Sequence, residues 1–284
     1  MRFQEKYFRL FFLLAVAFGF QGCKSTPVEQ SSGNNHPAIV QQGWNESYWN
    51  VDAGQQILNI RSGEWASMIE ASLYLTVCEL LENMNQRVGS RLVAEQNHWV
   101  AKCKRIAKAN ADEYEGGTMW SLEYSTSHGG LAQVRLEQLT KRLAQKKEKP
   151  AAVVKEADIS NFPARLKWFP SIFFLTTYEQ FWADEIASGN DNTRTWRHWA
   201  EFQDMKLQVA YAYLHLNLPA AEWQSVAKES ESWPDQKAHL QAQPAGSADE
   251  KDKRLGRAAA KRFVELEAHF TILKFCYDAG KGVN

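Results

Sequence analysis

Residues 64–115 read EWASMIEASLYLTVCELLENMNQRVGSRLVAEQNHWVAKCKRIAKANADEYE, and this stretch decides the fold class. It has no proline and a single glycine, Gly89. Its apolar residues recur at steps of three and four, the period of an α-helix, and no strand-like alternation is present. These residues are Ile69, Leu73, Val77, Leu80, Leu81, Met84, Val88, Leu92, Trp99, Cys103 and Ile106. We expect one helix on the order of 75 Å long, bent near Gly89-Ser90 because glycine weakens a helix interior.

A second amphipathic stretch follows Gly129-Gly130. Its apolar residues again keep helical spacing, and they are Leu131, Val134, Leu136, Leu139 and Leu143. The Lys-rich segment before Pro150 is typical of a helix C-terminus, since cations suit the last turn and proline prevents continuation. Gly116-Gly117 is expected to end the first helix, so the order of helix, glycine break and helix predicts an antiparallel hairpin.

The second half of the chain is also helical in pattern and richer in aromatic residues. After a connector at 150–160, we expect a core helix over 172–186, a turn at 188–192, a helix over 193–218, a loop over 241–249 and a last helix over 255–277. The helix over 172–186 is too short and too charged to cross a membrane. The pattern as a whole predicts an all-α fold, a hairpin or bundle of long amphipathic helices.

The first 23 residues indicate where the protein is located. They begin with basic residues, which are Arg2, Lys6 and Arg9. An apolar run over 10–20 follows, of about 11 residues or roughly 16 Å, too short for ~30 Å of hydrocarbon. These are the parts of a secretory signal, and Gly22 before Cys23 is similar to a bacterial lipobox. Residues 1–22 are therefore expected to be a lipoprotein signal peptide, and Cys23 the acylated mature N-terminus. The alternatives are an ordinary signal with a chance cysteine and a true membrane anchor.

Residues 23–50 are expected to hold the lipidated cysteine and a flexible tether, because 24–43 are rich in Ser, Gln, Asn and Pro. Lys24 is not the aspartate that commonly retains such lipoproteins in the inner membrane. We therefore expect the protein on the outer membrane of a bacterial envelope, facing the periplasm. Residues 51–149 are expected to form a helical hairpin domain, and 150–284 a second helical region.

Charge and cysteine content exclude several classes of protein. Lys+Arg and Asp+Glu are both 33, so the formal net charge is zero, which argues against nucleic acid as a partner. If Cys23 is acylated, an odd set of cysteines remains, Cys78, Cys103 and Cys276. On one straight helix Cys78 and Cys103 would be roughly 37 Å apart, beyond the ~7 Å limit of a disulfide. No cysteine or histidine spacing indicates a metal, and no cofactor is expected.

The short motifs that carry catalysis elsewhere are isolated in this chain. Ser225 and Lys228 fit the SxxK pattern of penicillin-binding proteins, but the second polar triplet and the KTG-like strand are missing. The carboxylate pairs Glu113/Glu115 and Asp184/Glu185 are neighbours in sequence, whereas sugar hydrolysis needs two carboxylates across a cleft. We therefore expect a protein that is not an enzyme.

Residues 80–143 resemble the LprI-type lysozyme-inhibitor domain of bacterial envelope proteins. The residues that carry the resemblance are Met84-Asn85, Leu92, Glu95-Gln96, Trp99, Glu115-Gly116-Gly117, Arg135 and Leu139. Order and spacing agree over less than a quarter of the chain. The resemblance implies a small helical module in which Gln96, Trp99, Arg135 and Leu139 are structural.

The chain also departs from this family. Cys103-Lys104 stands where members usually carry an Arg-Asp pair, and Ala107 and Ser127 stand near the usual cysteines, so that staple is missing. These departures bear on inhibitory activity more than on fold. The second half echoes the family pattern faintly and is a candidate diverged copy; the residues concerned are Asp204, Leu207-Gln208, Tyr211, Arg262 and Leu266.

The resemblance implies an envelope lipoprotein that acts by binding lysozyme or another envelope protein. Glu115, Gly116 and Gly117 are the candidate contact residues, because a polar glycine turn between helices can enter an acidic cleft. The main alternative is a structural lipoprotein that binds protein or peptidoglycan and inhibits nothing. A hydrolase of cell-wall material is the third hypothesis.

Overall fold

The computed structural model describes the chain from Trp44 onward, with gaps. The described residues are 44–51, 53–148, 166, 168–175, 178–188, 194–218 and 220–280, of which 46, 146–148, 220, 267–268 and 271–280 are described in backbone only. The expected signal peptide, Cys23, the tether over 24–43 and the connector over 150–160 lie outside these residues. The side chain of Cys276 is also outside them.

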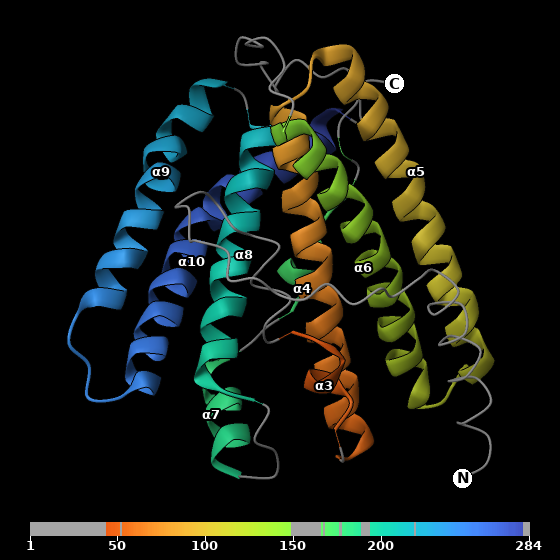
Figure 1. Ribbon diagram of the computed structural model, residues 1–284, viewed down its shortest axis with the longest axis vertical. Helices are drawn as coiled ribbons and strands as arrows, with labels where there is room; N and C mark the ends of the chain where they lie inside the picture. Colours follow the sequence, from red (N-terminus) through yellow and green to blue (C-terminus); the bar gives the residue numbers. More distant parts are fainter. Residues whose placement is uncertain are drawn as a thin grey trace. The chain divides into compact units, whose positions relative to one another are not determined.

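Helices account for nearly all of the described residues, and no strand occurs among them, which confirms the predicted all-α fold. The elements in Figure 1 are α3 (Glu46–Trp49), α4 (Gln55–Glu82), α5 (Gln86–Ala111), the 3₁₀ turn η1 (Asp112–Tyr114), α6 (Met119–Glu148), the 3₁₀ turn η3 (Ser171–Phe173), α7 (Glu179–Ser188), α8 (Trp196–Asn217), α9 (Ala220–Ala242) and α10 (Ala248–Gly280). All of them belong to one compact unit.

The long helix expected over 64–115 is two helices, and the bend predicted near Gly89-Ser90 is wrong. The chain turns at 83–85, between α4 and α5. There the Asn85 side chain accepts a hydrogen bond from the Val88 amide at 3.0 Å, which is a helix N-cap. Gly89 lies in the first turns of α5, where its amide donates to the Asn85 carbonyl. The apolar spacing continues across the turn, so it conceals the break.

The helix expected to begin after Gly129-Gly130 begins at Met119 instead, and α6 runs through both glycines. Gly129 is required by packing: a Cβ atom there would lie 2.3 Å from Cζ3 of Trp65 on α4. Gly130 has no such neighbour within 4 Å. The glycine pair is therefore a place of close helix approach and not a helix start.

Three boundaries in the second half also differ from the expectations. Residues 172–186 do not form one helix, because η3 ends at Phe173 and α7 begins at Glu179. The loop expected over 241–249 is shortened to 243–247, and the last helix begins at Ala248. The helix expected over 193–218 is α8, capped by Thr195, whose hydroxyl accepts from the His198 amide.

Two sets of three helices make up most of the fold. The first set is α4, α5 and α6, and the second set is α8, α9 and α10. In each set the first and third helices pack along each other most extensively, and the middle helix contacts them less. Helix α4 also packs against α8, so it lies between α6 and α8 (Figure 1). One apolar core therefore draws on both halves of the chain, and it includes Trp44 and Tyr48 near α3.

The first two helices of each set share a register. The shift along the chain that carries Trp65 to Trp199 also carries the buried carboxylate of Glu70 to that of Asp204. The same shift relates further pairs, each given with the residue of the first set before that of the second: Leu73 and Leu207, Leu80 and Leu214, Met84 and Leu218, Leu92 and Val226, and Trp99 and Trp233. All of these are buried except Trp99, which is partly buried against the core.

The third helices match under a slightly shorter shift, which carries Gly129 to Gly256. A Cβ atom on Gly256 would lie 2.3 Å from the ring of Trp199, as one on Gly129 would from the ring of Trp65. Further pairs under this shift are Ala132 and Ala259, Arg135 and Arg262, and Leu139 and Leu266.

Both sets also tie the middle helix to the third with an ion pair at the matched register. Arg135 on α6 lies 2.5 Å from Glu95 on α5, and Arg262 on α10 lies 3.3 Å from Glu229 on α9. Glu95 and Glu229 correspond under the first shift, and the two arginines under the second.

Candidate functional site

The residues that carry the family resemblance meet along α5 and α6. Gln96 is fully buried, and its Oε1 accepts a hydrogen bond from Arg135 Nε at 3.3 Å. Arg135 Nη2 donates to Glu95 Oε1 at 2.5 Å. Leu139 is buried in the core, and Trp99 packs partly buried against it. These side chains fix how α5 lies on α6; Gln96 and Leu139 are buried there, whereas the Glu95 side chain is exposed at the rim of the contact.

The turn between these helices is the exposed part of the motif. Glu115, Gly116 and Gly117 are all exposed, and Gly116 has a φ of +79°, a left-handed conformation that glycine adopts at little cost. Gly117 has little room for a side chain, because its Cβ would lie 3.2 Å from the Tyr114 carbonyl oxygen. The turn therefore presents backbone and one carboxylate to its surroundings.

Asp112 connects the two helix ends that flank this turn. It accepts hydrogen bonds from Lys108 Nζ at 2.5 Å and from Trp120 Nε1 at 3.2 Å, which join the end of α5 to the start of α6. The hydrogen bond to Lys108 lowers the pKa of Asp112, and the same bond raises the pKa of Lys108. These two hydrogen bonds thus tie the end of α5 to the start of α6 beside the exposed loop.

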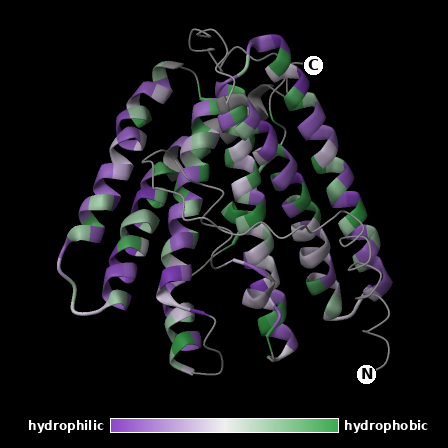
Figure 2. Ribbon diagram, in the orientation of Figure 1, coloured by the Kyte–Doolittle hydropathy of each residue, from purple (hydrophilic) through white to green (hydrophobic). Residues whose placement is uncertain are grey.

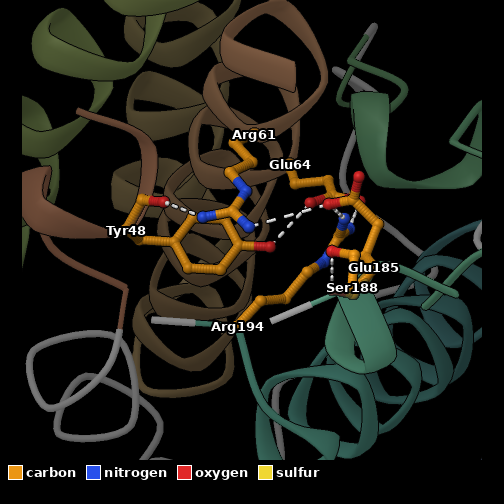
Figure 3. Close-up of polar contacts among 6 residues, drawn as sticks. All are labelled: Tyr48, Arg61, Glu64, Glu185, Ser188 and Arg194. Carbon is orange, nitrogen blue, oxygen red and sulfur yellow. Dashed lines mark hydrogen bonds and ion pairs between the residues drawn. The ribbon is translucent and has the colours of Figure 1, made fainter. Parts of the chain in front are cut away.

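A second group of polar side chains is buried where α3, α4, α7 and the start of α8 meet (Figure 3). Arg194 lies at its centre and donates to Glu64 Oε1 at 2.5 Å and to Glu185 Oε2 at 2.8 Å. Tyr48 donates its hydroxyl to Glu64 Oε2 at 2.6 Å, and Arg61 lies 3.6 Å from Glu185. The ring of Trp182 covers the Arg194 guanidinium at 3.7 Å.

The charges of this buried cluster compensate one another. Two arginines face two carboxylates, so the cluster is neutral when all four are ionised. Burial raises the pKa of Glu64, while Arg194 opposes that shift. Burial and the neighbouring Glu64 also raise the pKa of Tyr48, which keeps its phenol protonated. With each charge engaged by another side chain of the cluster, we interpret it as a clamp that joins the four elements.

Glu70 is the centre of a third buried group. Its carboxylate accepts from Trp168 Nε1 at 2.7 Å and from the Ser171 amide at 2.7 Å, and the Ser171 hydroxyl also donates to it. His128 Nε2 lies 3.9 Å from Glu70, and burial lowers the pKa of His128. The Glu70 carboxylate therefore lies between Ser171 and His128, and the Ser171 hydroxyl donates to this carboxylate and not to the imidazole.

The other sequence candidates lie apart from these groups. Ser225 is exposed on α9 and donates its hydroxyl to the Glu222 carbonyl at 2.6 Å, and Lys228 is exposed as well. Asp184 accepts from Gln180 on the surface of α7, while its neighbour Glu185 belongs to the Arg194 cluster. No candidate pair faces another across a shared site within the described residues.

Sequence reasoning missed the buried charges, which include Arg61, Glu64, Glu70 and Arg194. The available signal was the position of Glu64 and Glu70 among the apolar residues of α4, since isolated charges on an apolar helix face are rarely buried without partners. The partners themselves, such as Arg194 and Trp168, are far away in sequence and could not be identified.

Cys78 and Cys103 are free thiols, which confirms that they do not pair, although they lie on two helices and not on one. In the described part of the chain no helix is long and apolar enough to cross a bilayer, and no group of side chains there could hold a metal ion. Comparisons with protein-family models, with curated proteins and with solved structures find no match for this chain.

Proposed function

We propose that this chain is a lipoprotein of the bacterial cell envelope that acts by binding, and that the α5–α6 turn is its contact site. Its target is a lysozyme-like glycosidase, whose acidic cleft the turn enters. The resemblance of residues 80–143 to LprI-type inhibitors and the lipobox-like Cys23 support this proposal.

The second set of helices is a diverged copy of the first. The shared register, the two tryptophan–glycine contacts and the two matched ion pairs support a duplication. The copies differ at the turn: the link after α9 spans residues 243–247 and lacks the Glu-Gly-Gly sequence. Under the proposal, binding therefore belongs to the first copy.

One observation carries the proposal, namely the braced and exposed turn at Glu115–Gly117. A loop whose flanking helix ends are tied together loses less entropy on binding than one whose ends are free. Its two glycines allow a partner to approach the backbone closely. Lys104 is exposed about two helical turns before the end of α5 and supplies positive charge that complements an acidic cleft.

The test measures lysozyme activity in the presence of residues 24–284. This fragment retains the described core, which begins at Trp44. We expect inhibition at micromolar excess and its loss in Glu115→Trp, which places a large ring on the exposed turn. The matched control is Gly246→Trp in the equivalent link of the second set, where no atom lies within 4 Å of the added Cβ.

The outcomes separate the hypotheses. Loss of inhibition in Glu115→Trp with retention in Gly246→Trp supports the turn as the contact site. Equal loss in both variants contradicts it. If both c-type and g-type lysozymes keep full activity, inhibition is excluded, and pull-down from envelope extract then tests the alternative of a protein- or peptidoglycan-binding lipoprotein.

A further inference from the structure

Helix α5 carries an unusual concentration of positive charge for a chain whose net charge is zero. Its basic residues are Arg87, Arg91, Lys102, Lys104, Arg105 and Lys108, and Glu95 is its one acidic residue. All six basic side chains are exposed. The helix is therefore a local positive surface that the overall composition conceals. In Figure 2, hydrophilic residues recur along α5 between its apolar ones.

Four of these residues form a line along the helix. At 3.6 residues per turn, Arg87, Arg91, Lys102 and Arg105 fall within roughly 60° of one another around the axis and span about 27 Å along it. We call these four residues the basic stripe. It lies opposite the buried face of α5, which includes Leu92, Gln96 and Cys103.

The basic stripe has no partner in the described part of the chain. None of its four side chains forms an ion pair or a hydrogen bond with another side chain there, whereas Glu95, on the same helix, is engaged by Arg135 and Arg142. Exposed and unpaired cations of this kind contribute nothing to holding α5 on α6.

Comparison with α9 shows that the fold does not require the stripe. The positions of α9 that correspond to the four stripe residues hold no lysine or arginine, and they are Ala221, Ser225, Gln236 and His239. The positions that pack α5 on its neighbours are kept, as Glu95 and Glu229 show. The packing is shared by the two helices, and the positive charge is particular to α5.

We propose that the basic stripe docks α5 on the surface of a bilayer that contains anionic phospholipid. Rows of lysine and arginine are drawn to such surfaces by the negative potential of the headgroups. A polybasic surface is also a known second signal beside a lipid chain, and the N-terminal sequence predicts such a chain at Cys23. The stripe would then set which face of the protein rests against the membrane.

The chemistry of the stripe favours a bilayer over a macromolecular partner. None of the large exposed apolar side chains of the described residues lies on α5. Protein interfaces are usually centred on such anchors, and proteins that hold single-stranded nucleic acid stack its bases on aromatic rings. A flat row of cations without anchors suits a diffuse layer of headgroup charge.

The test uses residues 24–284, which carry no acyl chain, and sedimentation with vesicles. The vesicles contain phosphatidylcholine alone or phosphatidylcholine with phosphatidylglycerol. We expect binding only to the anionic vesicles at low salt, and release at about 1 M salt, where charges are screened beyond ~3 Å. Combined Arg87→Gln, Arg91→Gln, Lys102→Gln and Arg105→Gln should weaken binding about fivefold for each charge removed.

The matched control removes the same number of charges from α9 and α10, by Lys228→Gln, Lys251→Gln, Arg257→Gln and Lys261→Gln. Its binding should change less than about threefold, and circular dichroism should show both variants folded. Equal weakening in both variants would mean that net charge, and not the stripe, drives binding, and would overturn the proposal. Equal binding to neutral vesicles, no binding at low salt, or tighter binding to a single-stranded oligonucleotide than to anionic vesicles would overturn it as well.

Discussion

The contact of Trp65 with Gly129 in the first set is repeated by Trp199 and Gly256 in the second. The buried carboxylate near each contact, however, has different partners in the two sets. Glu70 in the first set accepts hydrogen bonds from neutral donors, the Trp168 indole and the Ser171 amide, and His128 Nε2 lies 3.9 Å from its Oε1. Asp204 in the second set pairs with the Lys237 ammonium at 2.5 Å and also accepts from an indole, that of Trp233. The packing of the two sets is thus matched, whereas the means of stabilising the charge has changed.

This difference teaches which features can vary. A tryptophan edge seated on a glycine leaves no room for a side chain, so both partners must be kept together. A buried carboxylate needs hydrogen-bond donors or a cation, but many side chains can supply them. The exposed face of the middle helix is freer still, which is why α5 can carry a basic stripe where α9 carries none.

The largest loss of stability is expected from a substitution in the Arg194 cluster, which joins the two sets of helices. The second set's Arg194 has no matching arginine in the first set, because Ile60 occupies the corresponding position. Arg194→Met leaves the buried Glu64 and the partly buried Glu185 with Arg61 as their one cation. We expect the free energy of unfolding to fall by about 3–5 kcal/mol, measured by chemical denaturation.

Arg197→Met is the matched control for this variant. Arg197 is exposed and pairs with Glu201 at 2.8 Å, so its loss should cost about 0–1 kcal/mol. Equal losses in the two variants would show that the buried cluster does not hold the sets together.

A smaller effect is expected from filling the shared tryptophan–glycine contact. Gly129→Ala and Gly256→Ala each force a methyl group against an indole ring, and overpacking of this kind costs about 1–3 kcal/mol. Gly130→Ala, where no atom lies within 4 Å of the added Cβ, should stabilise the helix by up to ~1 kcal/mol. Thermal unfolding of the three variants measures the difference. Similar midpoints for Gly129→Ala and Gly130→Ala would remove the packing reason for the repeated contact.

The smallest effect is expected from replacing His128 in the first set by leucine. Leucine is the residue that the second set has at the corresponding position, Leu255. Burial lowers the pKa of His128, although Glu70 opposes that shift. Below about pH 6.5 the unfolded chain therefore binds a proton that the folded chain excludes, and stability falls as the pH decreases. His128→Leu should make the free energy of unfolding less dependent on pH between about 7 and 5. Identical slopes for wild type and variant would contradict this reading.

The sequence predicts the helical class because apolar spacing is a local property. The prediction fails where a helix boundary leaves that spacing unchanged, or where it depends on a residue far away in the chain. Asn83 to Asn85 end one helix and cap the next without disturbing that spacing, and the spacing therefore favours the glycine at 89 as the break. Gly129 resembles a helix terminator until Trp65 is seen against it. The resemblance implies that Gln96 and Arg135 are structural, and in the fold Arg135 donates a hydrogen bond to Gln96 between α6 and α5.

The two buried thiols, Cys78 and Cys103, can report which part of the protein unfolds first. Cys78 is on α4 at the centre of the core, whereas Cys103 is on α5, which contacts α6 but hardly α4. Burial raises the pKa of Cys103 to about 12 and that of Cys78 well above its usual range, so neither thiolate reacts while the protein is closed. A thiol reagent should therefore label Cys103 first if α5 detaches as a separate cooperative unit. Labelling of both cysteines at one rate would mean that the core opens only by global unfolding.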